Sequence, residues 1–106
     1  MARAFETVTP VEGARLREAG AQVVDVRETI EWRRGRVPGA VHIPVLAVGR
    51  RAPEELDTRR AVVVLCASGH RSTVAARTLA KHGFAQVYDV HGGLSAWRRE
   101  GLPFET

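Results

Sequence analysis

A lone cysteine opens a short polar segment in the second half of the sequence, Cys66-Ala67-Ser68-Gly69-His70-Arg71-Ser72. Cys66 is the only cysteine among 106 residues, which excludes an internal disulfide and a multi-cysteine metal site. It is therefore either a buried structural thiol or a reactive one. The residues after it are too polar and rich in turn formers to continue a core strand, and Gly69 permits the positive φ that a tight curl requires. Such a curl turns several backbone N–H groups inward and makes a pocket for an anion, so the sequence favours a reactive thiol.

The elements on either side of this segment are expected to activate the thiol. Val62-Val63-Val64-Leu65 is apolar at every position, which is typical of a central parallel strand, and it leads directly into Cys66. A helix is predicted from Ser72 to His82. Because ligands of open parallel sheets bind beyond the carboxyl ends of the strands, we expect an exposed loop thiol that faces this crevice and not the core. The positive end of the helix, with Arg71 and His70 nearby, should favour the thiolate and make the sulfur nucleophilic.

Short apolar runs alternate with helical patterns along the chain, which indicates βα repetition. Thr9, Pro10 and Glu12 have the types and spacing of an N-cap, a first-turn proline and a capping box, and Gly20 is placed to end that helix. The other expected elements are strands at 22–26, 40–43, 62–65 and 86–90, a short helix at 28–34, a helix at 45–56 interrupted by Gly49 and Pro53, and a last helix that follows Gly92-Gly93 and carries Trp97. The pattern predicts a single α/β domain over residues 1–106, with three layers and a mainly parallel sheet.

Composition and charge exclude several classes of protein. The chain is 44% hydrophobic and 26% charged, with a net charge of +4. Its basic residues are scattered and do not form a tract, so we expect a solvated surface and no nucleic-acid partner. The longest apolar run, 61–67, is far too short to span a membrane, and residues 1–6 contain no apolar stretch that could serve as a signal peptide. These features predict a soluble, cytoplasmic protein with no membrane association.

Four motifs in the same order resemble those of the rhodanese-like sulfurtransferases. Cys66-x-x-Gly69-x-Arg71-Ser72 is similar to the active-site loop of that family. The other three similarities are Val24-Asp25-Val26-Arg27-Glu28 to the upstream Asp-Val-Arg strand, Gly35-Arg36-Val37-Pro38-Gly39-Ala40-Val41-His42-Ile43-Pro44 to the Gly-His-Ile-Pro-Gly-Ala element, and Val90-His91-Gly92-Gly93 with Trp97 and Gly101-Leu102-Pro103 to the C-terminal signature.

The resemblance implies a rhodanese-like domain with a five-stranded sheet. In this family the cysteine thiolate, here Cys66, takes sulfane sulfur from a donor such as thiosulfate or a persulfide, and a thiol or cyanide acceptor removes it. The backbone amides from Ala67 to Ser72 would hold the persulfide and the donor's anionic group, with Arg71 contributing charge. The resemblance requires no metal or organic cofactor. Its expected partners are a small sulfur donor and a thiol or cyanide acceptor, or a sulfur-carrier protein, for a chain that is a monomer or a weak dimer.

Two other functions compete with this one. A sulfur-relay or regulatory module would show little turnover with small donors. A phosphatase or arsenate reductase is disfavoured, because relatives with those activities have one more residue between cysteine and arginine than the six-residue loop from Cys66 through Arg71. Ala67 and Ser68 stand where thiosulfate-preferring relatives often carry basic residues, which favours a persulfide donor.

Other polar residues are expected to play supporting roles. Asp25 and Arg27 end a predicted strand at the same sheet edge as Cys66, and we expect a charge pair that braces the cysteine loop, with direct substrate contact as the alternative. His70 is expected to face solvent, although a catalytic role stays open. No metal site is predicted, because the remaining histidines lack ligand spacing: His42, His82 and His91.

Overall fold

The protein was analysed as a computed structural model that describes residues 4–106. Its strands are β1 (Glu6–Val8), β2 (Gln22–Asp25), β3 (Val41–His42), β4 (Val62–Leu65) and β5 (Val87–Val90). Its helices are α1 (Pro10–Glu18), α2 (Thr29–Arg34), the 3₁₀ turn η1 (Val45–Ala47), α3 (Val48–Glu55), α4 (His70–Lys81) and α5 (Gly93–Arg99).

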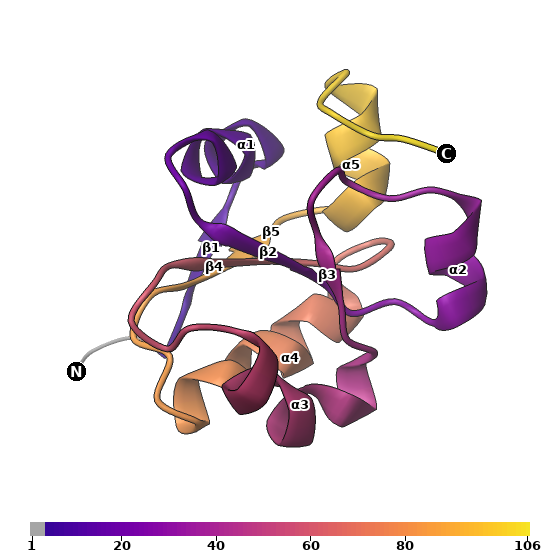
Figure 1. Ribbon diagram of the computed structural model, residues 1–106. Coiled ribbons are helices and arrows are strands. Elements are labelled where there is room, and N and C mark those ends of the chain that lie inside the picture. The colour runs from indigo at the N-terminus through magenta and orange to yellow at the C-terminus, as the bar shows by residue number, and fades with distance from the viewer. Residues whose placement is uncertain (1–3) are drawn as a thin grey trace.

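The five strands form one sheet in the order β1-β5-β4-β2-β3, and every neighbouring pair is parallel. Helices α1 and α5 cover one face, α3 and α4 cover the other, and α2 lies beyond the end of β2 (Figure 1). The expected three-layer α/β/α architecture, with its five-stranded, mainly parallel sheet, is confirmed.

Strand β4 lies at the centre of the sheet and contributes to both hydrophobic cores. Val64 packs with Leu79 in the core on the α3 and α4 side, whereas Leu65 packs with Trp97 in the core on the α1 and α5 side. All four residues of the strand are fully buried. The predicted burial of both faces is therefore confirmed, and the segment that follows β4 starts from a rigid support.

Local sequence chemistry explains where several helices begin. The backbone N–H of Glu12 donates to Thr9 Oγ1 over 3.1 Å, and Thr9 N–H donates to Glu12 Oε1 over 3.0 Å, so the capping box at the start of α1 is confirmed. Helix α4 begins at His70, two residues before the predicted start. Gly69 precedes it with φ of +103°, in the left-handed region that glycine adopts without strain.

Two predictions about elements are wrong. Strand β1 was not predicted, because three residues with only Val8 buried carry too little periodicity to be recognised. Helix α3 continues through Gly49 and Pro53, where an interruption was expected. Gly49 faces α4, and a Cβ there would be in ordinary contact with it, 3.4 Å from Thr78 Cγ2. Packing between the two helices has offset the weak local propensity.

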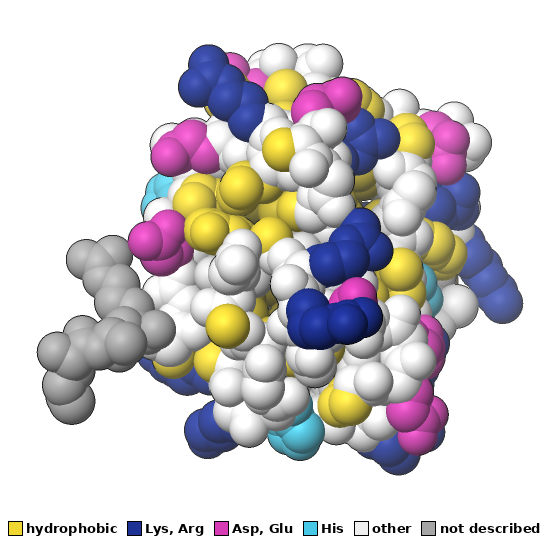
Figure 2. Space-filling view, turned by 60° about the vertical axis from the view of Figure 1, so that its left-hand side comes forward, with side chains coloured by type: hydrophobic (Ala, Val, Ile, Leu, Met, Phe, Trp, Pro, Cys, Tyr) yellow, Lys and Arg dark blue, Asp and Glu magenta, His cyan; other side chains and the backbone are white. Residues whose placement is uncertain are grey.

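The molecular surface mixes charges of both signs. On the face shown in Figure 2, acidic and basic side chains are interspersed among hydrophobic ones, without a continuous field of one sign. Within residues 4–106, the helices are too short and polar for any of them to cross a membrane.

Candidate active site

The Cys66 sulfur lies between the end of the central strand and the start of a long helix. Cys66 directly follows β4, and the chain then turns at Gly69 into α4, which has twelve residues. The backbone N–H of Gly69 donates to Cys66 Sγ over 2.9 Å. A charge-assisted hydrogen bond and the positive end of a helix both stabilise negative charge on sulfur. This geometry favours a thiolate.

The exposure expected for Cys66 is wrong. The residue is only 1% exposed and packs with Val64 and Ala75 in the core between the sheet and α4. Side chains alternate along a strand, so Cys66 continues the Val64 side of β4, where α4 lies directly over it. The thiol is therefore packed like a structural residue, and it is also hydrogen-bonded at a helix N-terminus.

Helix α5 holds the first peptides of the loop. The backbone N–H of Leu94 donates to the Cys66 carbonyl over 2.8 Å, and that of Ser95 donates to the Ala67 carbonyl over 3.0 Å. This approach requires Gly93, because a Cβ there would lie 2.5 Å from the Cys66 carbonyl oxygen. From the sequence, the glycines Gly92-Gly93 were expected to open a helix and to belong to the C-terminal signature, and their contact with the cysteine loop was not predicted. Their pairing was the available signal of a close backbone approach.

Arg71 is held by an acidic partner from α2. Its two terminal nitrogens donate to the Glu31 carboxylate over 2.6 and 2.9 Å. These hydrogen bonds are the main reason that the pKa of Glu31 is lowered from 4.5 to about 2. Glu31 in turn raises the pKa of Arg71, with a smaller contribution from charge on Cys66. Glu31 was not predicted as a partner of Arg71, and an anionic donor would have to compete with it for this guanidinium.

Asp25 and Arg27 form a buried ion pair, in which Arg27 Nη2 lies 2.7 Å from Asp25 Oδ2. The remaining donors of Arg27 bind the carbonyls of Glu31 and Gly35 over 3.3 and 2.7 Å. These bonds hold the segment around α2. The pair was expected to brace the cysteine loop. None of these Arg27 hydrogen bonds reaches that loop.

A carboxylate of β5 completes the surroundings of the thiol. Ser72 Oγ lies 3.4 Å from Cys66 Sγ and donates to Asp89 Oδ1 over 2.5 Å. Thr73 donates to the other carboxylate oxygen over 2.8 Å. Asp89 was not predicted as part of the site, although an acidic residue within a strand expected to be buried is a recognisable anomaly.

Two hollows flank the loop. One, of about 660 Å³, is bordered by the exposed residues Ser68 and His70 and reaches Asp89. The other, of about 540 Å³, lies beside Ala67 and is lined by several arginines, among them Arg98. The Gly69 amide and the Ser72 hydroxyl thus contact the sulfur, while Ala67, Ser68 and His70 border the two open spaces.

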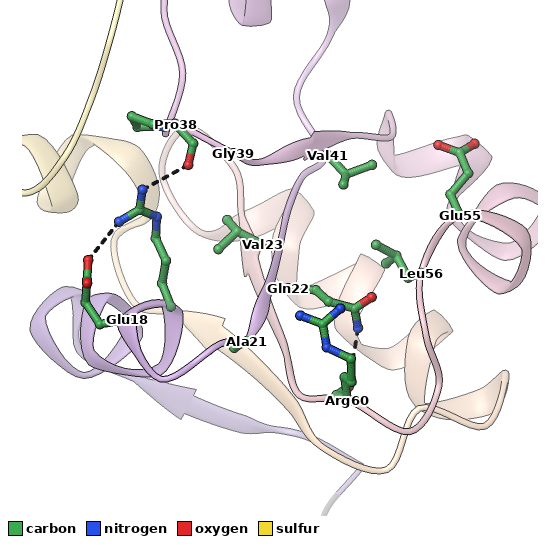
Figure 3. Close-up of a pocket in the computed structure, with 11 residues that line it drawn as sticks. Glu18, Ala21, Gln22, Val23, Pro38, Gly39, Val41, Glu55, Leu56 and Arg60 are labelled. Atoms are coloured by element: carbon green, nitrogen blue, oxygen red, sulfur yellow. Dashed lines mark hydrogen bonds and ion pairs between the residues drawn. The ribbon is translucent and has the colours of Figure 1, made fainter.

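A third hollow lies away from the cysteine, at the amino ends of β2 and β4. Gln22, Leu56 and Arg60 line it (Figure 3). Arg17 also borders it and donates to the Pro38 carbonyl over 3.0 Å. None of the loop residues borders this hollow. Residues 4–106 also contain no group of three or more histidine, cysteine, aspartate or glutamate side chains that could hold a metal ion.

Comparison with known proteins agrees with this arrangement. Residues 9–100 match the family model of the Rhodanese-like domain. The chain belongs to the rhodanese-like family. The thiosulfate sulfurtransferase GlpE of Pseudomonas syringae is 35% identical over 102 residues, which cover 96% of this chain and 94% of that protein. The Bacillus subtilis protein named "Putative sulfur carrier protein YrkF" is 43% identical over 75 residues, or 71% of this chain and 40% of that protein.

Solved structures show the same fold. A rhodanese-related protein from Thermoplasma volcanium superimposes with a TM-score of 0.82 and 29% identity, over 94% of this rhodanese-like chain and 97% of that one. The resemblance inferred from the four motifs is confirmed by these matches. The relatives named above connect the family membership of this chain with sulfur transfer.

Proposed function

We propose that this rhodanese-like chain is a sulfurtransferase that carries sulfane sulfur on Cys66. The observation that carries the proposal is the position of Cys66 Sγ, 2.9 Å from the Gly69 amide nitrogen at the N-terminus of α4. A helix N-terminus and an inward amide stabilise the thiolate before transfer and the terminal sulfur of a persulfide after it. Relatives named for thiosulfate sulfur transfer and sulfur carriage support the same conclusion.

The reaction needs two displacements at sulfur. With thiosulfate as the donor, the Cys66 thiolate attacks the outer sulfur, a new S–S bond forms, and sulfite leaves with the electron pair of the old S–S bond. An acceptor such as cyanide then attacks the terminal sulfur of the persulfide. Thiocyanate leaves and the thiolate is restored, so covalent catalysis divides one transfer into two steps.

The immediate surroundings of the sulfur favour a persulfide over thiosulfate as the preferred donor. Ala67 and Ser68 are uncharged, and the charge of Arg71 is already engaged by Glu31. The acceptor would be a thiol, cyanide or a sulfur-carrier protein in a reducing, cytoplasmic setting.

A sulfur-relay module is the second candidate. The similarity to YrkF favours it, because that protein's name describes a sulfur carrier. A relay would load Cys66 and pass the sulfur to a partner protein, with little turnover on small acceptors. A phosphatase or arsenate reductase remains disfavoured by the six-residue loop from Cys66 through Arg71.

Mass spectrometry of the purified protein separates these candidates. Incubation with thiosulfate or glutathione persulfide should add about 32 Da, the mass of one sulfur atom, to the Cys66 peptide. Steady thiocyanate release on adding cyanide supports the enzyme, whereas an adduct without turnover supports the relay. Absence of the adduct with every sulfane donor would overturn both. The matched control is Cys66→Ser, which should acquire no adduct.

A further inference from the structure

A hydroxyl group connects the thiol to a buried carboxylate. Ser72 Oγ lies 3.4 Å from Cys66 Sγ and 2.5 Å from Asp89 Oδ1. Ser72 is fully buried and Asp89 is 3% exposed. Among residues 4–106 the hydrogen-bond donors to this carboxylate are the hydroxyls of Ser72 and Thr73, and no cationic side chain pairs with it. Asp89 is thus a buried acid without a neutralising charge.

The partners of Ser72 determine the direction of these hydrogen bonds. Its hydroxyl has a single hydrogen, and two of its neighbours, Asp89 Oδ1 and the Gly69 carbonyl oxygen at 3.2 Å, can only accept. The shorter contact goes to Asp89, so Ser72 donates there. Its lone pairs are then free to accept the S–H of Cys66. The result is an ordered chain of donors from sulfur through hydroxyl to carboxylate.

Two negative charges at the ends of this chain would repel each other. A thiolate and a carboxylate separated by one hydroxyl, away from water, behave as a coupled pair that resists holding two charges. Such a pair retains one proton over a wide pH range. The position of that proton, on sulfur or on the carboxylate, then decides whether Cys66 can act as a nucleophile.

We propose that Cys66 and Asp89 share one negative charge through Ser72. When the thiolate forms, the S–H bond breaks and its proton passes to Ser72 Oγ, while the original hydroxyl proton passes to Asp89 Oδ1. The reverse transfers restore the thiol, and no atom is oxidised or reduced. Ser72 touches the reacting sulfur, whereas Asp89 is a positioning residue that acts through Ser72. The inference deepens the proposed sulfurtransferase function and rests on it.

The hollow beside Asp89 supports the proposal that Asp89 accepts the proton. Asp89 borders the space of about 660 Å³ that is also lined by Thr73 and His70. A proton held on Asp89 can therefore exchange with water in that space.

The test is the rate at which Cys66 reacts with iodoacetamide, a small neutral reagent, between about pH 4 and 9. A coupled pair keeps one charge across the middle of this range, so a constant minor fraction is thiolate and the wild-type rate should level off between about pH 5 and 7. In Asp89→Asn no proton can be shared. Its rate should fall about tenfold for each pH unit below the midpoint, as for a single thiol.

Two further substitutions test the hydroxyl between the two acids and the second donor to the carboxylate. Ser72→Ala removes the group that hydrogen-bonds both ends of the singly charged pair, so the pair holds its one proton less tightly and the pH range over which the rate is level should narrow. Thr73→Val removes a donor from the ionised carboxylate and makes it a better proton acceptor. The level rate of Thr73→Val should therefore be retained or raised.

Other titratable groups near the pair must be separated from it. His70, Arg77 and His91 line the hollow beside Asp89, and Arg71, paired with Glu31, faces Cys66. The arginines stay charged and Glu31 is ionised above about pH 4. The two histidines are the remaining ionisable side chains that line the hollow. Wild type and Asp89→Asn are therefore also compared in a His70→Gln/His91→Gln background. The level region of the rate must persist there when Asp89 is present and disappear in Asp89→Asn, even if the absolute rates change.

The proposal is overturned if folded wild-type protein shows the same single-thiol profile as Asp89→Asn. Should Asp89→Asn fail to fold, a level region in Ser72→Ala that is as wide as that of the wild type would also overturn it. Circular dichroism and the melting temperature report folding of each variant. Alkylation does not depend on sulfur transfer, so the two proposals can fail separately. If the rate has a level region but no persulfide ever forms, the shared charge is supported and the sulfurtransferase function is rejected.

Discussion

The sulfur of Cys66 belongs both to the hydrophobic core and to the proposed reactive site. Its contacts with Val64 and Ala75 belong to the hydrophobic core, while its hydrogen bond from Gly69 belongs to the loop. A substitution here should therefore affect both stability and chemistry. The two effects can be measured separately.

Cys66→Ser should abolish persulfide formation and lower the free energy of unfolding by about 1 kcal/mol, because a hydroxyl is more costly to bury than a thiol although it can keep the Gly69 hydrogen bond. Mass spectrometry and urea unfolding measure the two effects. A persulfide adduct that survives in Cys66→Ser would show that Cys66 is not the sulfur carrier. Ala67→Ser serves as the control for a hydroxyl added next to the site.

Glu31→Gln should destabilise the protein in a pH-dependent way. The Arg71 guanidinium lowers the pKa of Glu31 from 4.5 to about 2. A lowered carboxyl pKa contributes stability that is present above the unfolded value of 4.5 and is lost as the pH falls through about 2. Both side chains are about one-third exposed, so screening limits the expected difference at pH 7 to about 1 kcal/mol.

Urea unfolding of wild type and Glu31→Gln at pH 7 and pH 3 measures this difference, which should narrow at the lower pH. The amide oxygen introduced by Glu31→Gln can still accept the Glu28 N–H, so the start of α2 is preserved. Glu100→Gln, on the exposed end of α5, should show no comparable difference. An identical gap at both pH values would mean that the Glu31 charge contributes nothing.

At the scale of elements, the site is assembled where α4, α5 and the end of β4 meet. Two α5 amides bind the carbonyls of Cys66 and Ala67 and so position the first peptides of the loop. The Gly69 amide binds the sulfur itself. The alignment of the loop therefore depends on how closely α5 approaches it. Gly93 controls that distance.

Gly93→Ala should reduce sulfur transfer by at least about tenfold and destabilise the protein by more than about 1 kcal/mol, because its φ is positive and its Cβ would meet the Cys66 carbonyl. Gly101→Ala is the matched control, since Gly101 also has a positive φ but open space around its Cβ position. Gly101→Ala should show only the conformational cost. Equal losses of transfer in the two variants would contradict a role for the α5 approach.

The sequence predicts elements well where chemistry is local and poorly where partners are distant. Residues close together in the sequence determine the α1 capping box, the apolar strand β4 and the glycine turn before α4. Glu31 binds a residue forty positions away, and Asp89 binds Ser72 seventeen positions away, so neither partnership has a spacing signature. The burial of Cys66 was missed for a similar reason, because it depends on how α4 lies over β4.

At the scale of the whole molecule, net charge should influence the encounter with substrate. The chain carries +4, and its charges of both signs are interspersed on the face seen in Figure 2. A positive molecule attracts anionic donors over distances that salt screens, although scattered charges focus the field only weakly. The effect should be modest and general.

Raising the salt concentration from about 20 to 200 mM should slow persulfide formation from thiosulfate by about twofold to fivefold. The rate with neutral iodoacetamide at constant pH should stay nearly constant and serves as the control. Stopped-flow measurements of sulfite release would show the difference. An equal response of both reagents to salt would assign the change to the thiol and not to the encounter.

The central position of β4 also has a consequence for hydrogen exchange. Its four residues are fully buried between β2 and β5, so their amide hydrogens should exchange with solvent only when the whole domain unfolds. Cys66 is joined directly to this slowest-exchanging segment. Partial opening at the C-terminus or at α2 would leave the proposed nucleophile in place, and the capacity to load sulfur should disappear in the same cooperative transition as the fold.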